Sequence, residues 1–382
     1  MKYWLKEFVK SHRWLYATYY YVMSFVINCI KVFVKPDDKL ILFVSYGGKH
    51  YSDSPKNIFE RMQSDIRFSS FHFVWAFVKP DDFEIEGTEC IKIDTLKYFL
   101  TALKARVWIT NVIIERALNF TGKNTFYLCT SHGIPLKSIA QSSTSFRGIA
   151  RCLYDCCLAQ SEFDRQLQSS EFGIPIDKIE LLGYPRNDKF SGDHTEIIKR
   201  VRDYYGIRDN REIILYAPTY RDWNNGIERV ALDINKWEKK LGGNFVLLYR
   251  AHPTVKVELD NKHKDFFINA TSYEDLDDLL IAADILISDY SSMFFDYSIM
   301  HKPMICWAYD YDTFKKYRCL KVDLINEVYG GEISEDEVID YIEKGDYSDS
   351  IKEAVEFQNK YVTVYGNATL NALDLIAKKV SN

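Results

Sequence analysis

The sequence has no excess of basic residues, no internal repeat and no low-complexity tract. It carries 49 Lys and Arg against 54 Asp and Glu, a formal net charge of -5, whereas a general nucleic-acid binder needs a strongly basic surface. Hydrophobic residues make up 47% and charged residues 27% of the 382 residues, which excludes a disordered, collagen-like or coiled-coil chain. The length predicts two domains.

Recognisable metal-ligand spacings are also absent. The histidines lack the H-E-x-x-H pattern, and the adjacent Cys156 and Cys157, with Cys152 nearby, lack the paired C-x-x-C spacing of a zinc site. Asp310 and Asp312 resemble a carboxylate pair for a divalent ion, but their aromatic loop is interpreted as a solvated turn. We therefore expect buried thiols in a reducing compartment, no metal and no cofactor.

The N-terminal region has no apolar run long enough for a typical spanning helix. Residues 14–30 are uncharged but rich in Tyr, they fall short of the about 20 apolar residues that a span needs, and no small-residue cleavage site follows them. Basic residues flank the run: Lys2, Lys6, Lys10, Arg13, Lys31 and Lys35. A buried helix and a true anchor stay open, but aromatic residues beside basic flanks favour an interfacial helix. We expect residues 1–35 to be an amphipathic membrane-associating segment on anionic lipids, peripheral at the cytoplasmic face of the cell membrane.

The rest of the chain alternates apolar, strand-like runs with helical patterns. The runs lie at 39–45, 71–78, 104–109, 125–130, 157–159 and 179–182, and then at 213–216, 245–250, 285–288 and 303–306. The charged stretch 188–209 separates the two series, and two such series predict an α/β protein with two doubly wound parallel sheets. We expect an N-terminal domain at 36–195, a C-terminal domain at 196–355, and a C-terminal helix within 356–382 that packs back on the first domain.

Polar clusters follow the predicted strands, at the sheet edge where ligands of such folds gather. After the run at 285–288, Asp289, Ser291 and Ser292 open a helix whose free N–H groups and hydroxyls suit a phosphate. Plain helix capping is the other interpretation of this cluster. Thr219 and Arg221 follow the run at 213–216, and Arg221 is a candidate bidentate phosphate ligand.

Two histidines also follow strands. Arg250 and His252 lie two residues apart and would face the same side of an extended chain, so His252 is a candidate phosphate ligand or proton donor, or else a structural residue. His132 precedes Gly133 and is a candidate general base, or else it caps a turn, while Lys137 could neutralise an anionic substrate.

Two loops of the first half are also polar. The loop 45–56 is flexible and polar and carries a cation near its centre, and because it lies in the first domain we expect it to face an acceptor substrate across the cleft. The segment 183–188 is interpreted either as a hinge or as a turn that exposes Arg186.

Six of these segments, in this order, resemble one family. They are SYGGKHYSDSPK (45–56), SHGIPLK (131–137), GYPRND (183–188), YAPTYR (216–221), RAHP (250–253) and SDYSSMFFD (288–296). Together they are similar to the CDP-glycerol glycerophosphotransferases of bacterial teichoic acid synthesis.

The resemblance implies a GT-B fold, in which two Rossmann-like domains face a central cleft and no metal is used. It implies that His132 deprotonates the acceptor hydroxyl and that His252 contacts the donor phosphates or assists the leaving group. The donor-binding residues would be Arg221, Thr219, Arg250, Asp289, Ser291, Ser292 and Asp296. The acceptor-side residues would be Gly48, Lys49, Ser52, Asp53 and Lys137.

The implied reaction transfers glycerol phosphate from CDP-glycerol to a hydroxyl of an acceptor linked to a polyprenyl (undecaprenyl diphosphate disaccharide) lipid, and it releases CMP, as in a primase. Tyr365 and Asn371 replace an acid and an Arg of the family's C-terminal pattern, so the donor could differ. A CDP-ribitol or other polyol-phosphate transferase or polymerase, a nucleotide-sugar glycosyltransferase and a non-catalytic scaffold stay open as alternatives, and an oligomer is possible.

Overall fold

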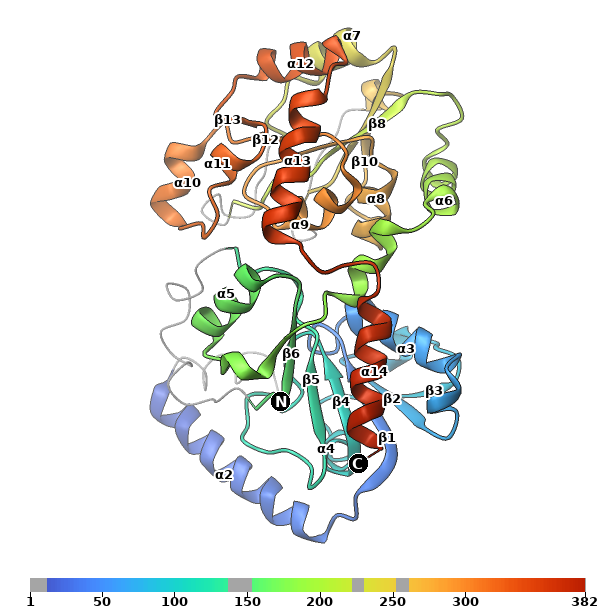
Figure 1. Cartoon of the computed structure of the whole chain (residues 1–382), viewed down its shortest axis with the longest axis vertical. Coiled ribbons are helices and arrows are strands. Elements are labelled where there is room, and N and C mark those ends of the chain that lie inside the picture. Colours follow the sequence, from blue (N-terminus) through green and yellow to red (C-terminus); the bar gives the residue numbers. More distant parts are fainter. Residues whose placement is uncertain (1–11, 137–152, 222–229, 252–260, 382) are drawn as a thin grey trace. The chain divides into compact units, whose positions relative to one another are not determined.

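The computed structural model describes residues 12–136, 153–221, 230–251 and 261–381 (Figure 1). These residues form two compact units. The first, called unit 1, contains 12–134, 153–188 and 364–381, and the second, called unit 2, contains 135–136, 189–221, 230–251 and 261–363.

Unit 1 is built on a seven-stranded parallel sheet of order β3-β2-β1-β4-β5-β6-β7. Its strands are β1 (Asp37–Val44), β2 (His72–Phe77), β3 (Thr88–Lys92), β4 (Ala105–Thr110), β5 (Phe126–Cys129), β6 (Cys156–Ala159) and β7 (Ile179–Leu181). Residues 40–44 of β1, most of β4 and all of β5 are buried because helices cover both faces of these strands.

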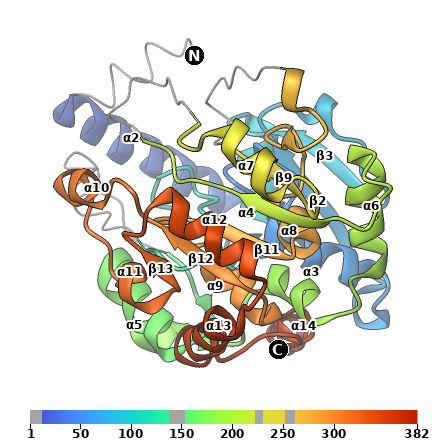
Figure 2. The same cartoon turned by 90° about the horizontal axis from the view of Figure 1, so that it is seen from above.

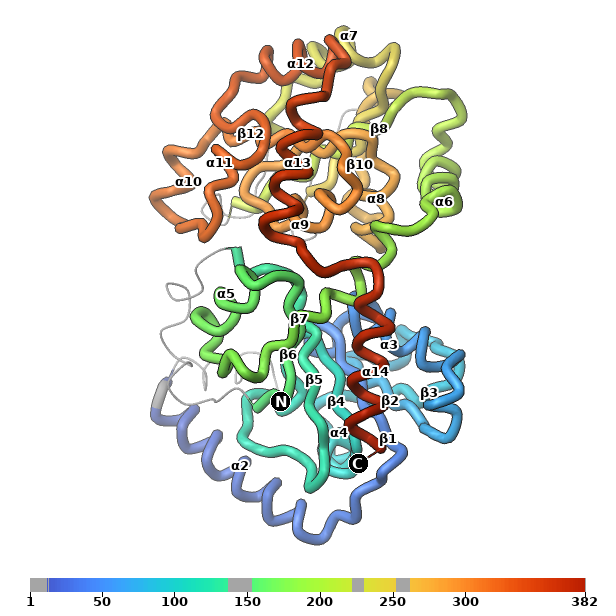
Figure 3. The backbone as a smooth tube through the Cα atoms, in the orientation of Figure 1, coloured from blue at the N-terminus to red at the C-terminus, as the bar shows by residue number. Residues whose placement is uncertain are grey.

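The helices of unit 1 form two layers. They are α2 (Arg13–Phe33), α3 (Asp53–Gln63), α4 (Leu96–Lys104), α5 (Glu162–Phe172) and α14 (Ala368–Val380), with short 3₁₀ turns at Ile66–Phe68, Pro80–Asp82 and Ile176–Lys178. On one face α2 and α4 pack against Leu40 and Leu42 of β1. On the other face α3 and α14 pack against Ile41 and Phe43, and Figure 3 shows α14 beside α3 although the two helices lie at opposite ends of the chain.

Unit 2 is built on a six-stranded parallel sheet of order β10-β9-β8-β11-β12-β13. Its strands are β8 (Glu212–Tyr216), β9 (Phe245–Tyr249), β10 (Phe267–Asn269), β11 (Ile285–Ser288), β12 (Met304–Trp307) and β13 (Gly330–Gly331). In each unit the first strand lies inside the sheet, the next two strands follow on one side of it, and the later strands follow on the other side. This is the doubly wound order of dinucleotide-binding folds.

Helices also cover the sheet of unit 2. They are α6 (Thr195–Tyr205), α7 (Ile234–Leu241), α8 (Leu276–Ala282), α9 (Met293–Tyr297), α10 (Tyr311–Tyr317), α11 (Leu324–Glu327), α12 (Glu335–Lys344) and α13 (Ser348–Tyr361), with 3₁₀ turns at Asn261–His263 and Ser298–Met300. A further 3₁₀ turn at Pro185–Ser191 contains the boundary between the two units. On one face α7 and α12 lie side by side (Figure 2) and bury Trp237 and Ile339 against β8 and β9.

The predicted α/β class with two parallel sheets is confirmed. The sequence did not reveal β3, β10 and β13, which are all edge strands. Among the described residues, no helix has the length and apolar character needed to cross a membrane.

Gly183 allows the returning C-terminal segment to approach β6 closely. It adopts φ +79°, and a Cβ at this position would lie 2.7 Å from the Val364 carbonyl oxygen and 3.0 Å from the Ala368 Cβ. The main chain on both sides is hydrogen-bonded, since Gly183 N donates to Ala159 O and Val364 N donates to Gln160 O. Neither backbone can therefore move away easily.

We predict that Gly183→Ala destabilises unit 1 by about 3 kcal/mol or more, because it combines a left-handed backbone with a main-chain clash. Gly173→Ala is the matched control: Gly173 has φ +66° but no atom within 4 Å of its built Cβ, so it should cost only about 1–2 kcal/mol. Urea unfolding followed by tryptophan fluorescence measures both, and equal losses would contradict the close approach.

Candidate active site

In unit 1 the two central strands β1 and β4 end side by side, with Val44 paired to Thr110. Here the chain turns outward in opposite directions, which in such sheets creates the ligand crevice. The turn after β1 is joined to the residue after β4, because Tyr46 N donates to Asn111 Oδ1 over 2.8 Å. The turn also closes on itself through Gly48 N, which donates to Ser45 O over 2.8 Å.

His132 lies beside this junction. It follows β5 and is exposed, and its Nδ1 lies 3.0 Å from the main-chain oxygen of Asn111. The Tyr46 ring meets the imidazole edge to face, with centroids 6.2 Å apart. A carbonyl oxygen only accepts hydrogen bonds, so Nδ1 is the donor nitrogen, and in the neutral ring Nε2 is then the acceptor nitrogen.

The predicted acceptor-side residues Gly48, Ser52 and Asp53 come together at this junction. The Ser45 hydroxyl donates to Ser52 O over 2.9 Å. The buried Asp53 carboxylate accepts from the Tyr46 hydroxyl over 2.6 Å. Lys49 is exposed on the same turn. Lys137 lies outside the described residues.

Sequence reasoning did not assign Arg186 to this site. Its side chain is only 12% exposed and its Nη1 lies 3.5 Å from Asp53 Oδ2. A Cβ on Gly133 would lie 3.0 Å from Arg186 Nη2, so the guanidinium lies beside the backbone that follows His132. The interpretation of this residue as a surface Arg in a turn is therefore wrong. Its position in the loop after a strand was the sequence feature that could have assigned it to the site.

A buried polar network supports the same segment from behind. The Asp164 carboxylate accepts from the Tyr184 hydroxyl over 2.5 Å, from Gln160 N over 3.0 Å and from Gln168 Nε2 over 3.1 Å. Burial raises the pKa of Asp164 to about 6, although these hydrogen bonds act in the opposite direction. Tyr184 also contacts the Ser131 hydroxyl, next to His132.

In unit 2 the corresponding junction lies between β8 and β11. Thr219 N donates to Asp289 Oδ1 over 2.9 Å, and the Ser288 hydroxyl donates to Ala217 O over 2.6 Å. The Arg221 guanidinium is 3% exposed and donates through Nη2 to Asp289 Oδ2 over 2.8 Å. The sequence-predicted donor residues Thr219, Arg221 and Asp289 thus form one cluster.

Asp310 completes this cluster. It accepts from Arg221 Nε over 2.8 Å and from the Tyr290 hydroxyl over 2.9 Å. Burial opposes the charge of Arg221, but Asp289 and Asp310 outweigh it and raise the pKa of the guanidinium. The expectation of a solvated turn is therefore wrong for Asp310, whereas Asp312 is exposed and pairs with Lys315.

The other predicted donor residues lie around the same strand ends. Ser291 and Ser292 are half-buried after β11, where the Ser291 hydroxyl accepts from Met293 N over 3.2 Å, and Asp296 is buried on α9. Arg250 follows β9, and its Nη1 donates to Tyr273 O over 2.7 Å and to Ala270 O over 3.2 Å. Burial lowers the pKa of Arg250. His252 lies outside the described residues.

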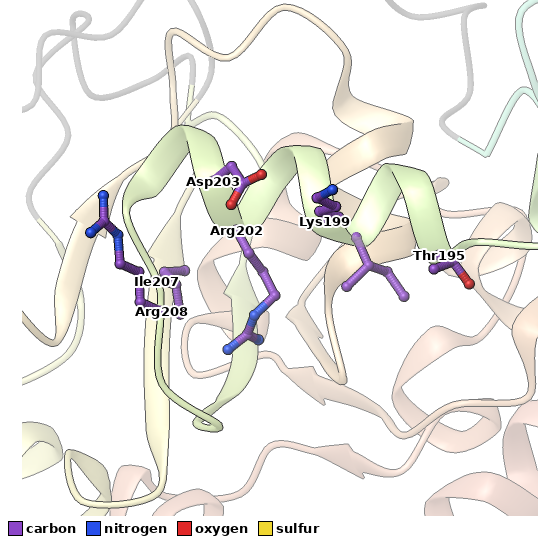
Figure 4. Close-up of a pocket in the computed structure, with 7 residues that line it drawn as sticks. Thr195, Lys199, Arg202, Asp203, Ile207 and Arg208 are labelled. Atoms are coloured by element: carbon purple, nitrogen blue, oxygen red, sulfur yellow. The ribbon is translucent and has the colours of Figure 1, made fainter.

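An open depression of unit 2 lies elsewhere. It runs along α6 and is lined by Thr195, Ile198, Lys199, Arg202, Asp203, Ile207 and Arg208 (Figure 4). None of the predicted site residues lines it. In the described parts of the chain, no three His, Cys, Asp or Glu side chains are grouped as metal ligands.

Two doubly wound parallel sheets with polar groups at their strand ends resemble the architecture of the GT-B class of proteins. Residues 26–377 match the family model of CDP-Glycerol:Poly(glycerophosphate) glycerophosphotransferase. The chain belongs to this family, so the family resemblance and the enzyme class predicted from the motifs are confirmed.

Individual relatives agree with this assignment. A teichoic acid poly(glycerol phosphate) polymerase of Staphylococcus epidermidis is 32% identical over 305 residues, which cover 74% of this chain but only 42% of the polymerase. A teichoic acid glycerol-phosphate transferase of Staphylococcus aureus is 28% identical, with 86% and 87% of the two chains covered. A solved structure of the wall teichoic acid polymerase TagF matches with a TM-score of 0.82, 25% identity and coverage of 97% and 98%.

The raised pKa of Asp164 predicts that unit 1 loses stability as the pH rises. An unfolded Asp loses its proton near pH 3.8, whereas folded Asp164 keeps it to about pH 6. The folded state therefore binds more protons between these values, and its stability falls through this window by about 3 kcal/mol.

Asp164→Asn removes this titration. Unfolding in urea at pH 4 and at pH 7 should show the variant gaining about 2–2.5 kcal/mol relative to the original chain between the two pH values. Glu162→Gln, on the exposed side of the same helix, should keep a constant difference. A constant difference for Asp164→Asn as well would contradict the prediction.

Proposed function

We propose that this chain transfers glycerol phosphate from CDP-glycerol to a hydroxyl of a polyprenyl-linked saccharide at the cytoplasmic face of the membrane and releases CMP. The observation that carries the proposal is the exposed His132 at the end of β5, whose Nδ1 is occupied by a main-chain carbonyl. Family membership over residues 26–377 supports the choice of donor.

The geometry suits a general base. Nε2 of His132 takes the proton of the acceptor hydroxyl, and the alcohol oxygen attacks the phosphorus that bears glycerol. The bond between this phosphorus and the bridging oxygen breaks, so CMP departs with the electron pair while the glycerol phosphate joins the acceptor. The reaction needs no covalent enzyme intermediate. It needs hydrogen-bond donors placed to stabilise the charge on the phosphoryl oxygens.

The donor side belongs to unit 2. We assign the hydroxyls of Thr219, Ser291 and Ser292 to the diphosphate, together with His252. In the structure the Arg221 guanidinium is held by Asp289 and Asp310, which keeps the loop after β8 in place. Arg250 similarly anchors the loop after β10 through two carbonyl oxygens.

We propose that α2 lies on the membrane. Tyr16, Tyr20 and Ile27 of this helix are buried in unit 1. The opposite side presents aromatic and aliphatic side chains to solvent: Trp14 (68% exposed), Tyr21 (66%), Phe25 (71%), Val32 (66%) and Phe33 (89%). An amphipathic helix of this composition with Lys35 at its end suits the headgroup region of anionic lipids.

The reaction is tested by incubating the purified chain with a lipid-linked disaccharide and CDP-glycerol, CDP-ribitol or a UDP-sugar. We expect acceptor-dependent CMP release with CDP-glycerol alone, and a loss of at least about 100-fold in His132→Ala with unchanged CDP-glycerol binding. His72→Ala is the control, because His72 begins β2 at the opposite end of the sheet.

Other outcomes separate the alternatives. Turnover with CDP-ribitol or a UDP-sugar alone would replace the proposed donor, and no turnover with any donor would favour a scaffold. Near-normal transfer by His132→Ala would rule out His132 as the base.

The membrane role is tested by sedimentation with vesicles of phosphatidylglycerol and of phosphatidylcholine. We expect binding to the anionic vesicles, and about tenfold weaker binding or more when Trp14 and Phe25 are replaced by Ser, because each loses apolar burial. Tyr204→Ser removes an equally exposed aromatic residue of unit 2 (62%) and should have no effect. Unchanged sedimentation of the α2 variant would reject this placement.

A further inference from the structure

Asn111 holds the two parts of the unit 1 junction together. It is the residue after β4 and is 1% exposed. Its side-chain Oδ1 accepts from Tyr46 N over 2.8 Å, and its main-chain oxygen lies 3.0 Å from His132 Nδ1. One residue therefore contacts both the turn after β1 and the imidazole after β5.

Contact with the main-chain oxygen fixes the state of the imidazole. A neutral imidazole has one donor and one acceptor nitrogen, and only the donor can face a carbonyl oxygen. The bond therefore selects the tautomer with the proton on Nδ1 and limits rotation of the ring. In the neutral ring Nε2 is then the acceptor nitrogen, as a general base requires.

The side-chain contact acts on His132 through Tyr46. Tyr46 has φ +46°, a left-handed conformation that a residue with a Cβ keeps only when its surroundings hold it. Asn111 Oδ1 holds its N–H, and Asp53 accepts from its hydroxyl over 2.6 Å. The ring held in this way packs edge to face against the His132 imidazole.

Packing alone does not explain why residue 111 has an amide side chain. Its buried Nδ2 has no hydrogen-bond partner in the structure as described, and an unmade hydrogen bond at a buried position is costly. An apolar residue of the same size would avoid this cost but would leave Tyr46 N without its acceptor. The position therefore requires the side-chain oxygen Oδ1, which accepts from Tyr46 N.

We propose that Asn111 is the positioning residue for His132, acting through its main-chain oxygen and through Tyr46. The proposal rests on the proposed function, in which His132 is the base. Asn111 is buried and lies in unit 1, whereas the proposed donor side belongs to unit 2, so loss of its side chain should lower the rate of the chemical step and leave donor binding unchanged.

The kinetic test compares Asn111→Ala, Asn111→Asp and Asn119→Ala. Asn111→Ala should lower kcat about 10- to 100-fold, because a displaced imidazole is no longer well placed to take the proton of the acceptor hydroxyl. The KM for CDP-glycerol should stay within twofold of the original value. Asn111→Asp keeps an acceptor for Tyr46 N and should recover at least about tenfold of the lost rate, relative to the alanine variant. Asn119 is exposed in the same loop, so Asn119→Ala should behave like the original chain.

A second readout is independent of activity. In protein labelled with ¹⁵N-histidine, the His132 ring signals, assigned by their loss in His132→Ala, should show the Nδ1–H tautomer. Asn111→Ala keeps the main-chain oxygen but releases Tyr46, so the imidazole should shift off this oxygen and give a mixture of tautomers. If the original chain transfers nothing from CDP-glycerol, the proposed function fails but this measurement still tests the positioning.

Three results would overturn the proposal. They are a kcat of Asn111→Ala within twofold of the original, an Asn111→Asp variant no better than the alanine variant, and an unchanged His132 tautomer in Asn111→Ala. The aspartate variant also covers the case in which Asn111→Ala does not fold.

Discussion

In a doubly wound parallel sheet two neighbouring strands end together and their loops leave in opposite directions, so the first backbone N–H groups of these loops lack a strand partner. Both units meet this constraint in the same way. The side chain directly after the fourth strand accepts from the loop after the first strand: Asn111 accepts from Tyr46 N and Asp289 accepts from Thr219 N, over 2.8 and 2.9 Å. The positions agree although the sequence shows no internal repeat, which indicates that the geometry of the junction selects a short side chain with an oxygen there.

The two choices of side chain have different electrostatic consequences. Asp289 is a buried charge and needs a cation, which Arg221 supplies. Asp310 accepts from Nε and Nη2 of the same guanidinium, and Nη1 donates to the main-chain oxygen of Thr219. The junction of unit 2 is therefore a rigid ion network, expensive to disrupt because removal of one member leaves another buried and unpaired. Asn111 is neutral and needs no cation. Its side chain adds no charge at this junction, where the main-chain carbonyl and the Tyr46 ring contact the imidazole.

Most of the fold could be predicted from the sequence because strands buried on both faces are apolar runs, as in β4 with its sequence ARVWIT. The strands that were missed, β3, β10 and β13, lie at sheet edges, where fewer neighbours demand apolar residues. The site was predictable where a residue follows a strand, as His132 does. Arg186 and Asp310 were not, since their partners Asp53 and Arg221 are distant in the chain and only the folded structure brings them together.

The C-terminal helix depends on the same segment that supports the histidine. The Asp188 carboxylate accepts from Ala368 N and Thr369 N over 2.8 and 2.7 Å at the start of α14, where an anion is favourable. Asn371, at the position where the family pattern has Arg, directs Nδ2 to Leu182 O over 3.5 Å. A shorter, neutral side chain at this position thus serves packing against the segment 182–188. That segment also supplies Tyr184 and Arg186 to the surroundings of His132, so α14 and His132 are both supported by the same stretch of unit 1.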